Sequence, residues 1–490
     1  MHYIVSRPKP RSREISFEDV LLDLIDDIKL SEMTKAPSKK ELTNTRVDCV
    51  KYLPDKLINY TRTKDYIERF EQFYAYYQHM DIFFDENCNY AKQLEIKSKY
   101  EQEYGRDIEM EKTVQEKTKE ELESQGMVYN PYYNTFYLLK SSSKPGQKKY
   151  RQIDAPEPAL KNALSQLKTL FEEFMCYNTY HTSAFAYIPG RCTHDLVKRL
   201  QKNRSRWILK LDFSNFFGSV TLDFTMQQLE QIYPFSTICA TKRGKTALKN
   251  CLKLCFLDGH LPQGTPISPL LTNIIMIPID YHISNILGNN ASQITSFDKD
   301  NVCGTVESVE ALNKIINPRN GDVYGTPDGD YLFTGKDWVK RMDYRLIYNR
   351  YADDMYIGSH RGFRYGPVID EINKILDKFN APMKLNTSKT KYCSTNGKNW
   401  ILGLMYNQDQ QITVGHRRKK ELQATIANFA MDYNAGQPWN IQDTRIAMGN
   451  MSYVNNIEPL YVASILEKYS AKFGIDIKET MKSIIAGSVA

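Results

Sequence analysis

The chain of 490 residues is predicted to have an α+β fold with a helical N-terminal extension. Residues 1–125 contain amphipathic and charged stretches with helical spacing, of which Lys97–Gln125 predicts a long exposed helix or a linker. From residue 126 to about residue 405, apolar strand-like runs alternate with helical segments, and helical periodicity returns from Arg417 onward. A strand–turn–strand pattern around Asp353-Asp354 places two adjacent carboxylates at a turn.

Composition and charge indicate a globular protein with room for two or three domains. The hydrophobic share of 41% and the charged share of 25% are ordinary for globular chains. A net charge of +7 is compatible with nucleic-acid binding but is too modest to establish it. The nine cysteines include no C-x-x-C pair, which indicates reduced thiols. Because no apolar run reaches about 18 residues, we expect a cytoplasmic protein with no membrane partner.

The first element after the extension is predicted to be a basic β-hairpin. Residues 133–139 form an apolar and aromatic run, a turn with Ser, Pro and Gly follows, and residues 148–153 form the return strand. Lys149 and Arg151 lie on that return strand. Two interpretations stay open for them: they embrace a triphosphate, or they belong to a solvated hairpin.

The rest of the chain presents four polar features in a fixed order. They are Asp212 after the apolar strand 207–211, Gln263-Gly264 before a helix, the Asp353-Asp354 turn, and Lys389 after a helix. Two Mg²⁺ ions held by carboxylates activate a 3′-hydroxyl and stabilise the leaving pyrophosphate, which a lysine neutralises or protonates. The set therefore predicts nucleotidyl transfer. A polar segment at about residues 289–342 is predicted to be an insertion between two core elements.

Around these residues the chain closely resembles the reverse transcriptase family. Segments in the family's order resemble its motifs A to E, namely Leu209–Phe217, Leu261–Asn273, Arg350–Asp354, Leu385–Thr390 and Trp400–Leu404. Arg151–Pro156 and Ala186–Arg191 resemble the family's fingers motifs. The segment resembling motif B is very specific, whereas Y-x-D-D alone is a weak signal. The resemblance covers about residues 130–470.

The resemblance implies a right-hand polymerase with fingers, palm and thumb. It implies a helical extension at 1–125, fingers at 126–205, a palm with part of the fingers and the insertion at 206–405, and a helical thumb at 406–490. The first 125 residues have no match in a minimal retron enzyme, and the insertion is longer than the resemblance leads us to expect. Either segment is expected to bind RNA, mediate oligomer contacts, hold an effector, or act as a spacer.

The resemblance also assigns expected roles to individual residues. Two Mg²⁺ ions would be held by Asp212, Asp353, Asp354 and the backbone carbonyl of Phe213. The incoming nucleotide would meet Phe217 as a steric gate against a 2′-hydroxyl, Gln263 and Gly264 in packing, Lys149 or Arg151 at the triphosphate, and Lys389 near the pyrophosphate. Nucleic acid would contact Trp400 and Gly403 of the primer grip and the basic residues Arg417, Arg418, Lys419 and Lys420.

The expected task is the copying of a cognate non-coding RNA into DNA from dNTPs, in antiphage defence. This expectation follows from resemblance to bacterial retron-type and defence-associated enzymes, several of which form homo-oligomers. A protein-primed or untemplated DNA polymerase that makes repetitive DNA is an alternative that the sequence does not separate. A non-catalytic RNA-binding scaffold is disfavoured by the three retained carboxylates, and an RNA-dependent RNA polymerase is disfavoured by Phe217.

Overall fold

The computed structural model of the chain describes most of the region that resembles the polymerase family. The described residues are 63–84, 88–139, 148–175, 180–289, 324–325, 331–333, 338–340, 346–395, 399–407 and 409–487. Residues 1–62 of the predicted extension and most of the predicted insertion lie outside them. Three short strands of the insertion are described, and they pair in sequence order: β4 (Tyr324–Gly325), β5 (Tyr331–Phe333) and β6 (Trp338–Lys340).

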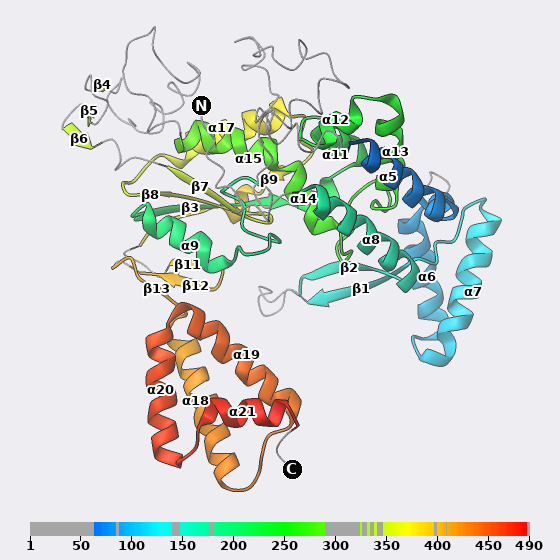
Figure 1. Cartoon of the computed structure of the whole chain (residues 1–490). Helices are drawn as coiled ribbons and strands as arrows, with labels where there is room; N and C mark the ends of the chain where they lie inside the picture. The colour runs from blue at the N-terminus through cyan, green and yellow to red at the C-terminus, as the bar shows by residue number, and fades with distance from the viewer. Residues whose placement is uncertain are drawn as a thin grey trace.

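A central antiparallel sheet carries the predicted carboxylates (Figure 1). Its strands run in the order β10-β3-β8-β7, with bounds Lys391–Ser394, Trp207–Ser214, Asp354–Ser359 and Ile347–Tyr351. A short strand, β9 (Lys384–Leu385), pairs with the end of β3. Strands β7 and β8 are buried along most of their length because α15 (Ile277–Ser284) and α9 (Thr193–Lys202) both pack against β7.

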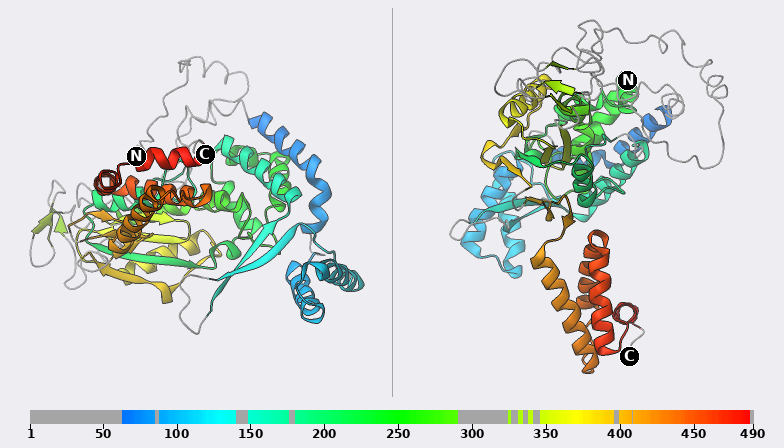
Figure 2. Two further views of the ribbon diagram at one scale, coloured as in Figure 1. Left: turned by 90° about the horizontal axis from the view of Figure 1, so that it is seen from below. Right: turned by 90° about the vertical axis from the view of Figure 1, so that its left-hand side faces the viewer.

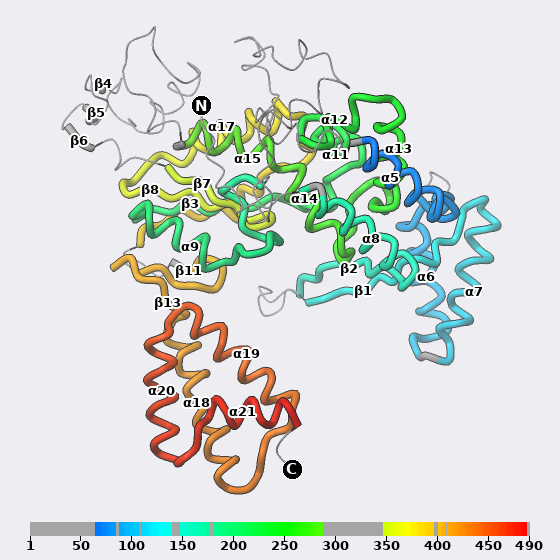
Figure 3. The backbone as a smooth tube through the Cα atoms, viewed as in Figure 1, coloured from blue at the N-terminus to red at the C-terminus, as the bar shows by residue number. Residues whose placement is uncertain are grey.

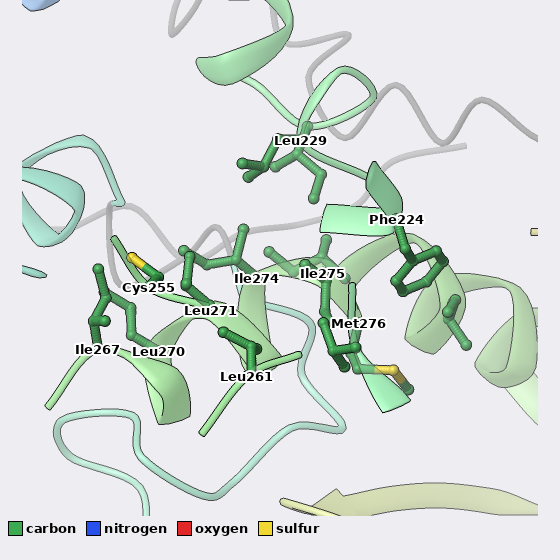
Figure 4. Close-up of a cluster of buried hydrophobic side chains, with 14 of the residues drawn as sticks. Phe224, Leu229, Cys255, Leu261, Ile267, Leu270, Leu271, Ile274, Ile275 and Met276 are labelled. Carbon is green, nitrogen blue, oxygen red and sulfur yellow. The ribbon is translucent and has the colours of Figure 1, made fainter. Parts of the chain in front are cut away.

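Helix α14 (Ser268–Ile275) lies in the main hydrophobic core. It is apolar nearly all round, which suits a helix with no solvent-facing side. Figure 4 shows Leu271 and Ile274 of α14 close to Leu229 of α11 (Leu222–Leu229). This burial fixes the segment that precedes α14, including Gln263-Gly264. The other elements of this part of the chain are α10 (Phe216–Ser219), α12 (Phe235–Cys239), α13 (Lys242–Lys253), η3 (Asn285–Asn289), α17 (Tyr365–Lys378) and η5 (Thr387–Lys389).

Among the described helices, none is by itself long and apolar enough to cross a membrane. Helix α14 and the run Ile277–Leu287 meet the criteria of length and composition only as a pair, with a bend of 42° between them. Both belong to the buried core.

The described part of the N-terminal region is helical. Helix α5 (Thr63–Tyr77) and the 3₁₀ turn η1 (Gln78–Phe84) are followed by α6 (Tyr90–Tyr104) and α7 (Ile108–Ser124). The prediction of one long helix or linker over Lys97–Gln125 was wrong, because the chain turns at Gly105 with φ +97° and folds back as a helical hairpin. Helix α5 packs on α13, where Arg243 forms an ion pair with Glu71.

The predicted basic hairpin is present beside these helices. Strand β1 (Tyr133–Leu139) pairs antiparallel with β2 (Tyr150–Pro156), and α8 (Pro158–Phe174) follows with proline in its first turn. The apolar side chains near the hairpin tip are exposed, Leu138 and Leu139 each by more than half.

The C-terminal region is a helical unit that projects away from the sheet (Figures 2 and 3). Three short strands precede the helices and pair in order: β11 (Asn399–Ile401), β12 (Leu404–Tyr406) and β13 (Ile412–Thr413). The helices are α18 (His416–Asn434), α19 (Ile441–Ile457), α20 (Pro459–Phe473) and α21 (Ile477–Ile485). A second hydrophobic core joins this unit to β12 and α9.

Candidate active site

Strand register brings the three predicted carboxylates together at one edge of the central sheet. Asp212 near the end of β3 lies directly opposite Asp354 at the start of β8. The Phe213 N–H donates a hydrogen bond to the carbonyl of Asp353, with 3.3 Å between the two atoms. The turn that carries Asp353 contains Ala352 in the left-handed region, at φ +55°. The carboxylates are therefore neighbours because β3 and β8 pair, although about 140 residues separate them in sequence.

Two lysines already neutralise part of this negative charge. Lys389 Nζ lies 2.6 Å from Asp212 Oδ2, and Lys210 Nζ lies 2.9 Å from Asp354 Oδ2. The Tyr356 hydroxyl also donates to Asp354 Oδ2, over 3.3 Å. Burial raises the pKa of Asp353, and the nearby charges of Asp354 and Asp212 raise it further while Lys389 opposes them.

The carboxylates suit a hard divalent cation in chemistry and backbone position. Among the described residues, no three His, Cys, Asp or Glu side chains form a ready metal cluster. Asp212 and Asp354 each direct one carboxylate oxygen to a lysine ammonium and not to a shared metal position. The carboxylate oxygens of Asp212, Asp353 and Asp354 nevertheless have the chemistry that a hard cation such as Mg²⁺ prefers, and the strand register places their backbones together.

Gln263 and Gly264 dock on the fingers hairpin. The Gln263 carbonyl accepts a hydrogen bond from the Asp154 N–H of β2, at 2.7 Å. Gly264 has φ +126°, and a Cβ there would lie 2.9 Å from the Asp154 carbonyl oxygen. Only glycine fits this close approach without strain. The contact fixes the hairpin relative to α14.

Two aromatic rings follow Asp212 in the predicted nucleotide site. Phe213 is buried and stacks on Phe216 with ring centroids 5.2 Å apart. Phe217 is partly buried and meets Phe216 edge-on at 5.8 Å. The predicted roles of the Phe213 carbonyl and the Phe217 ring stay predictions.

The predicted triphosphate residues lie on the exposed hairpin. Arg151 is on β2 opposite Leu138, and Lys149 immediately precedes β2. Both side chains are exposed. Burial raises the pKa of the Tyr187 phenol, and the charge of Arg151 only partly opposes this rise.

Sequence analysis did not assign roles to three residues of this site, Tyr187, Lys210 and Arg350. Tyr187 has φ +57° and is 53% exposed. Burial raises the pKa of its phenol, and the charge of Asp353 raises it further. All three residues lay inside the motifs that were recognised, but only the strand register reveals which groups Lys210 and Arg350 contact.

The predicted nucleic-acid residues lie on β11–β12 and α18. Trp400 is 52% exposed and packs against Gly415. A Cβ on Gly415 would lie 2.5 Å from the indole ring. Gly403 occupies the β11–β12 turn at φ +81°.

The four basic residues at the start of α18 differ in their surroundings. Arg417 pairs with Glu421 at 2.7 Å, and Arg418 lies 4.6 Å over the Tyr453 ring. Lys419 is half-buried and forms an ion pair with Glu458, whereas Lys420 is exposed. Lys419 is thus engaged within the helical unit, while the side chains of Arg417, Arg418 and Lys420 face solvent.

Comparisons with known proteins agree with these features. The family described as reverse transcriptase (RNA-dependent DNA polymerase) matches residues 142–413. The retron Ec83 reverse transcriptase of Escherichia coli is 22% identical over 344 residues, covering 68% of this chain and 85% of the relative. The retron Ec73 reverse transcriptase of Escherichia coli is 19% identical over 294 residues, covering 59% and 74%.

A solved structure of telomerase from Candida albicans aligns with a TM-score of 0.30 and 12% identity, covering 70% of this chain and 60% of the telomerase chain. The family match spans more than half of the 490 residues. The chain therefore belongs to the reverse transcriptase family, and it is a retron-type RNA-directed DNA polymerase.

Proposed function

We propose that this reverse transcriptase extends DNA by a two-metal mechanism at Asp212, Asp353 and Asp354. The family generally uses divalent metal ions together with an RNA template and dNTPs. The observation that carries the proposal is the register that sets Asp212 opposite Asp354, with Asp353 at the adjoining turn. Bound Mg²⁺ ions would activate the primer 3′-hydroxyl and stabilise the leaving pyrophosphate.

The lysines beside the carboxylates would act as exchangeable counter-ions. In the described arrangement Lys389 is 60% exposed while its ammonium contacts Asp212, so the side chain has room to swing outward. With metal ions held by the carboxylates, Lys389 would be available to neutralise the pyrophosphate. Lys210 lies within β3 and has less freedom, being 32% exposed and also 5.3 Å above the Tyr356 ring.

The incoming nucleotide would lie between the hairpin and the carboxylate edge. Phe217 would exclude the 2′-hydroxyl, and Gln263-Gly264 would pack beside the base and template. Arg151 would hold the triphosphate, which its exposure on β2 and its electrostatic proximity to Tyr187 support. Lys149, the alternative residue for holding the triphosphate, lies two residues closer to the hairpin tip.

The proposed task is the copying of a cognate non-coding RNA in the cytoplasm, in defence against phage. The retron reverse transcriptases among its relatives support a retron-like task. A homo-oligomer and the defence role rest on the resemblance alone and stay predictions.

Protein-primed synthesis is a second candidate, favoured by the position of Tyr187. This phenol is half-exposed, and the charges of Asp353 and Arg151 both act on it. A priming acceptor would have to reach the carboxylate edge of the sheet. If Tyr187 is the acceptor, Tyr187→Phe abolishes protein-linked DNA and leaves extension of an added primer intact.

The test of the metal site is the double variant Asp353→Ala with Asp354→Ala. We expect it to abolish DNA synthesis while circular dichroism and RNA binding stay as in the wild type. Asp370→Ala is the matched control, because Asp370 is an exposed carboxylate on α17. Retained polymerase activity in the double variant would refute the metal-site assignment.

A further inference from the structure

A fully buried ion pair lies directly beneath the turn that carries Asp353 and Asp354. Arg350 and Asp280 are 1% and 0% exposed, and Arg350 Nη2 lies 2.8 Å from Asp280 Oδ2. Arg350 Nε contacts Asp280 Oδ1 as well, at 2.9 Å, so the guanidinium binds the carboxylate through two nitrogens. Arg350 precedes Asp353 by three residues in the sequence, whereas Asp280 belongs to α15.

Two further buried side chains complete the network. The Tyr348 hydroxyl donates to Asp280 Oδ1 at 2.8 Å, from the same strand as Arg350. Asn273 of α14 accepts from Arg350 Nη1 at 3.2 Å and donates through Nδ2 to the carbonyl of Ala186 at 2.6 Å. The network therefore links β7, α14, α15 and the segment next to Tyr187.

One contact of Arg350 reaches the turn itself. Arg350 Nη1 donates to the carbonyl of Ala352, over 3.1 Å. Ala352 has φ +55°, a left-handed conformation that costs an alanine roughly 1–2 kcal/mol. Its carbonyl is part of the peptide that leads into Asp353. A donor held at this carbonyl favours the one turn conformation that sends both carboxylates to the sheet edge.

Burial energetics argue that this pair is present for geometry more than for stability. Taking two charges out of water is expensive, and buried pairs can often be replaced by apolar side chains without loss of stability. An apolar side chain would lack the rigidly spaced N–H donors of the planar arginine guanidinium. Here Asp280 and Asn273 accept hydrogen bonds from the Arg350 guanidinium and fix its orientation, and its Nη1 also donates to the Ala352 carbonyl.

We infer that Arg350 is a positioning residue for the Asp353-Asp354 turn, with Asp280 and Asn273 fixing its guanidinium. The inference rests on the proposed metal site, because its effect is exerted through those carboxylates. Arg350 thus acts as an outer-shell partner of the metal ligands, one peptide away from them.

Iron-directed cleavage of the full-length protein tests this inference without measuring polymerase activity. Fe²⁺ with ascorbate and peroxide cuts a backbone beside a bound ion, and mass spectrometry locates the cuts. The measured quantity is the Fe²⁺ concentration that gives half-maximal cleavage near Asp212 and Asp353. Arg350→Lys and Asp280→Asn are expected to raise that concentration roughly 10–100-fold, the usual loss when an outer-shell partner is removed.

A stability-matched control separates positioning from general destabilisation. Leu164→Ala removes a fully buried side chain of α8, outside the network. It should lower the melting temperature and keep the wild-type cleavage midpoint. An unshifted midpoint in Arg350→Lys and Asp280→Asn, or an equal shift in Leu164→Ala, would overturn the inference.

A milder variant covers the case in which Arg350→Lys does not fold. Tyr348→Phe deletes only the hydroxyl that donates to Asp280, so a smaller shift in the same direction is expected and no shift counts against the inference. Wild-type protein without cuts near Asp212 and Asp353 would refute the proposed metal site itself. Wild-type cuts with unshifted variants would overturn the positioning role alone.

Discussion

At the scale of single residues, Asp212 and Asp354 each meet a lysine, and this pairing sets how the site responds to metal. Lys210 contacts Asp354 at 2.9 Å from the neighbouring strand. A cation in that position competes with any metal ion for the same oxygen. At the proposed metal site, the ammonium would therefore lower the metal affinity while it relieves repulsion among the carboxylates.

Replacing Lys210 with methionine should strengthen the response to metal. Lys210→Met removes the competing charge, so the rise in melting temperature on adding Mg²⁺ to EDTA-treated protein should exceed that of the wild type. Differential scanning fluorimetry over a Mg²⁺ series measures it. Lys249→Met is the control, because Lys249 pairs with Asp223 on the surface. A smaller Mg²⁺ response in Lys210→Met would mean that Lys210 supports metal binding.

Replacing Phe217 should relax sugar selection. Phe217→Ala removes the ring expected to clash with a 2′-hydroxyl, so the preference for dNTPs over rNTPs should fall on the order of 10–200-fold. Single-nucleotide incorporation with each sugar measures the ratio of kcat/KM values. Phe217→Tyr keeps the ring and should keep the selectivity. If Phe217→Ala discriminates as well as the wild type, Phe217 is an ordinary core aromatic.

At the scale of elements, the segment 180–191 is joined to β7 by two backbone hydrogen bonds, both with Arg350. The Arg350 N–H donates to the Ser183 carbonyl at 2.7 Å, and the Phe185 N–H donates to the Arg350 carbonyl at 3.0 Å. Buried His181 contacts the Ser183 hydroxyl through Nδ1 at 2.6 Å. Burial holds the pKa of His181 well below its usual range, and the charges of Arg199, Arg191 and Arg350 lower it further.

This histidine should make the protein less stable in mild acid. Its pKa is lowered in the fold, so the unfolded chain takes up a proton first as pH falls below about 6.5. This contribution to the free energy of unfolding is thus fully present above that pH. Below it, the free energy of unfolding declines by at most about 1.4 kcal/mol per pH unit. Denaturant unfolding between pH 7 and 5 measures the slope. His181→Asn should flatten it, whereas His79→Asn, an exposed histidine, should not.

The limits of sequence reasoning are visible in these same elements. The strands that carry Asp212 and the Asp353-Asp354 turn were predictable from apolar runs that end in acidic residues. Their register was not, because pairing between β3 and β8 is a long-range contact that local patterns do not encode. The turn at Gly105 was missed because charged residues continue on both sides of this single glycine. The turn at Gly403 was missed because β11 and β12, which it joins, have only three residues each.

For the candidate active site too, some features were predictable from the sequence and others were not. The order of polar features predicted the carboxylates, Gln263-Gly264 and Lys389, and the family resemblance added Phe217. The resemblance supplied no partner for Arg350, because Asp280 lies 70 residues away on α15. Nor did it distinguish Lys419, which is bound to Glu458, from its exposed neighbours.

At the scale of the whole molecule, the projecting helices α18–α21 carry basic residues that are candidates for gripping nucleic acid. Arg417, Arg418 and Lys420 are exposed at the start of α18. Each phosphate contact contributes roughly 0.9 to the slope of log K against log salt for duplex DNA, and roughly 0.7 for single strands.

Neutralising these three residues together should flatten the salt dependence of binding. Arg417→Gln, Arg418→Gln and Lys420→Gln should reduce the slope by roughly one unit per lost phosphate contact. Fluorescence anisotropy of a labelled template–primer across a salt series measures it. A control with equal charge change is the triple glutamine variant of Lys112, Lys117 and Lys119 on α7. If both variants change the slope equally, the α18 residues contribute only to overall charge.

Templated synthesis by this polymerase is tested by the RNA that copurifies with the full chain. The measurement is DNA synthesis with Mg²⁺ and each dNTP singly or all together, followed by sequencing of the product and of the copurified RNA. We expect a product that requires all four dNTPs, is complementary to the bound RNA, and is absent from the Asp353→Ala, Asp354→Ala protein. A product made from a single dNTP with no complementary RNA would contradict it.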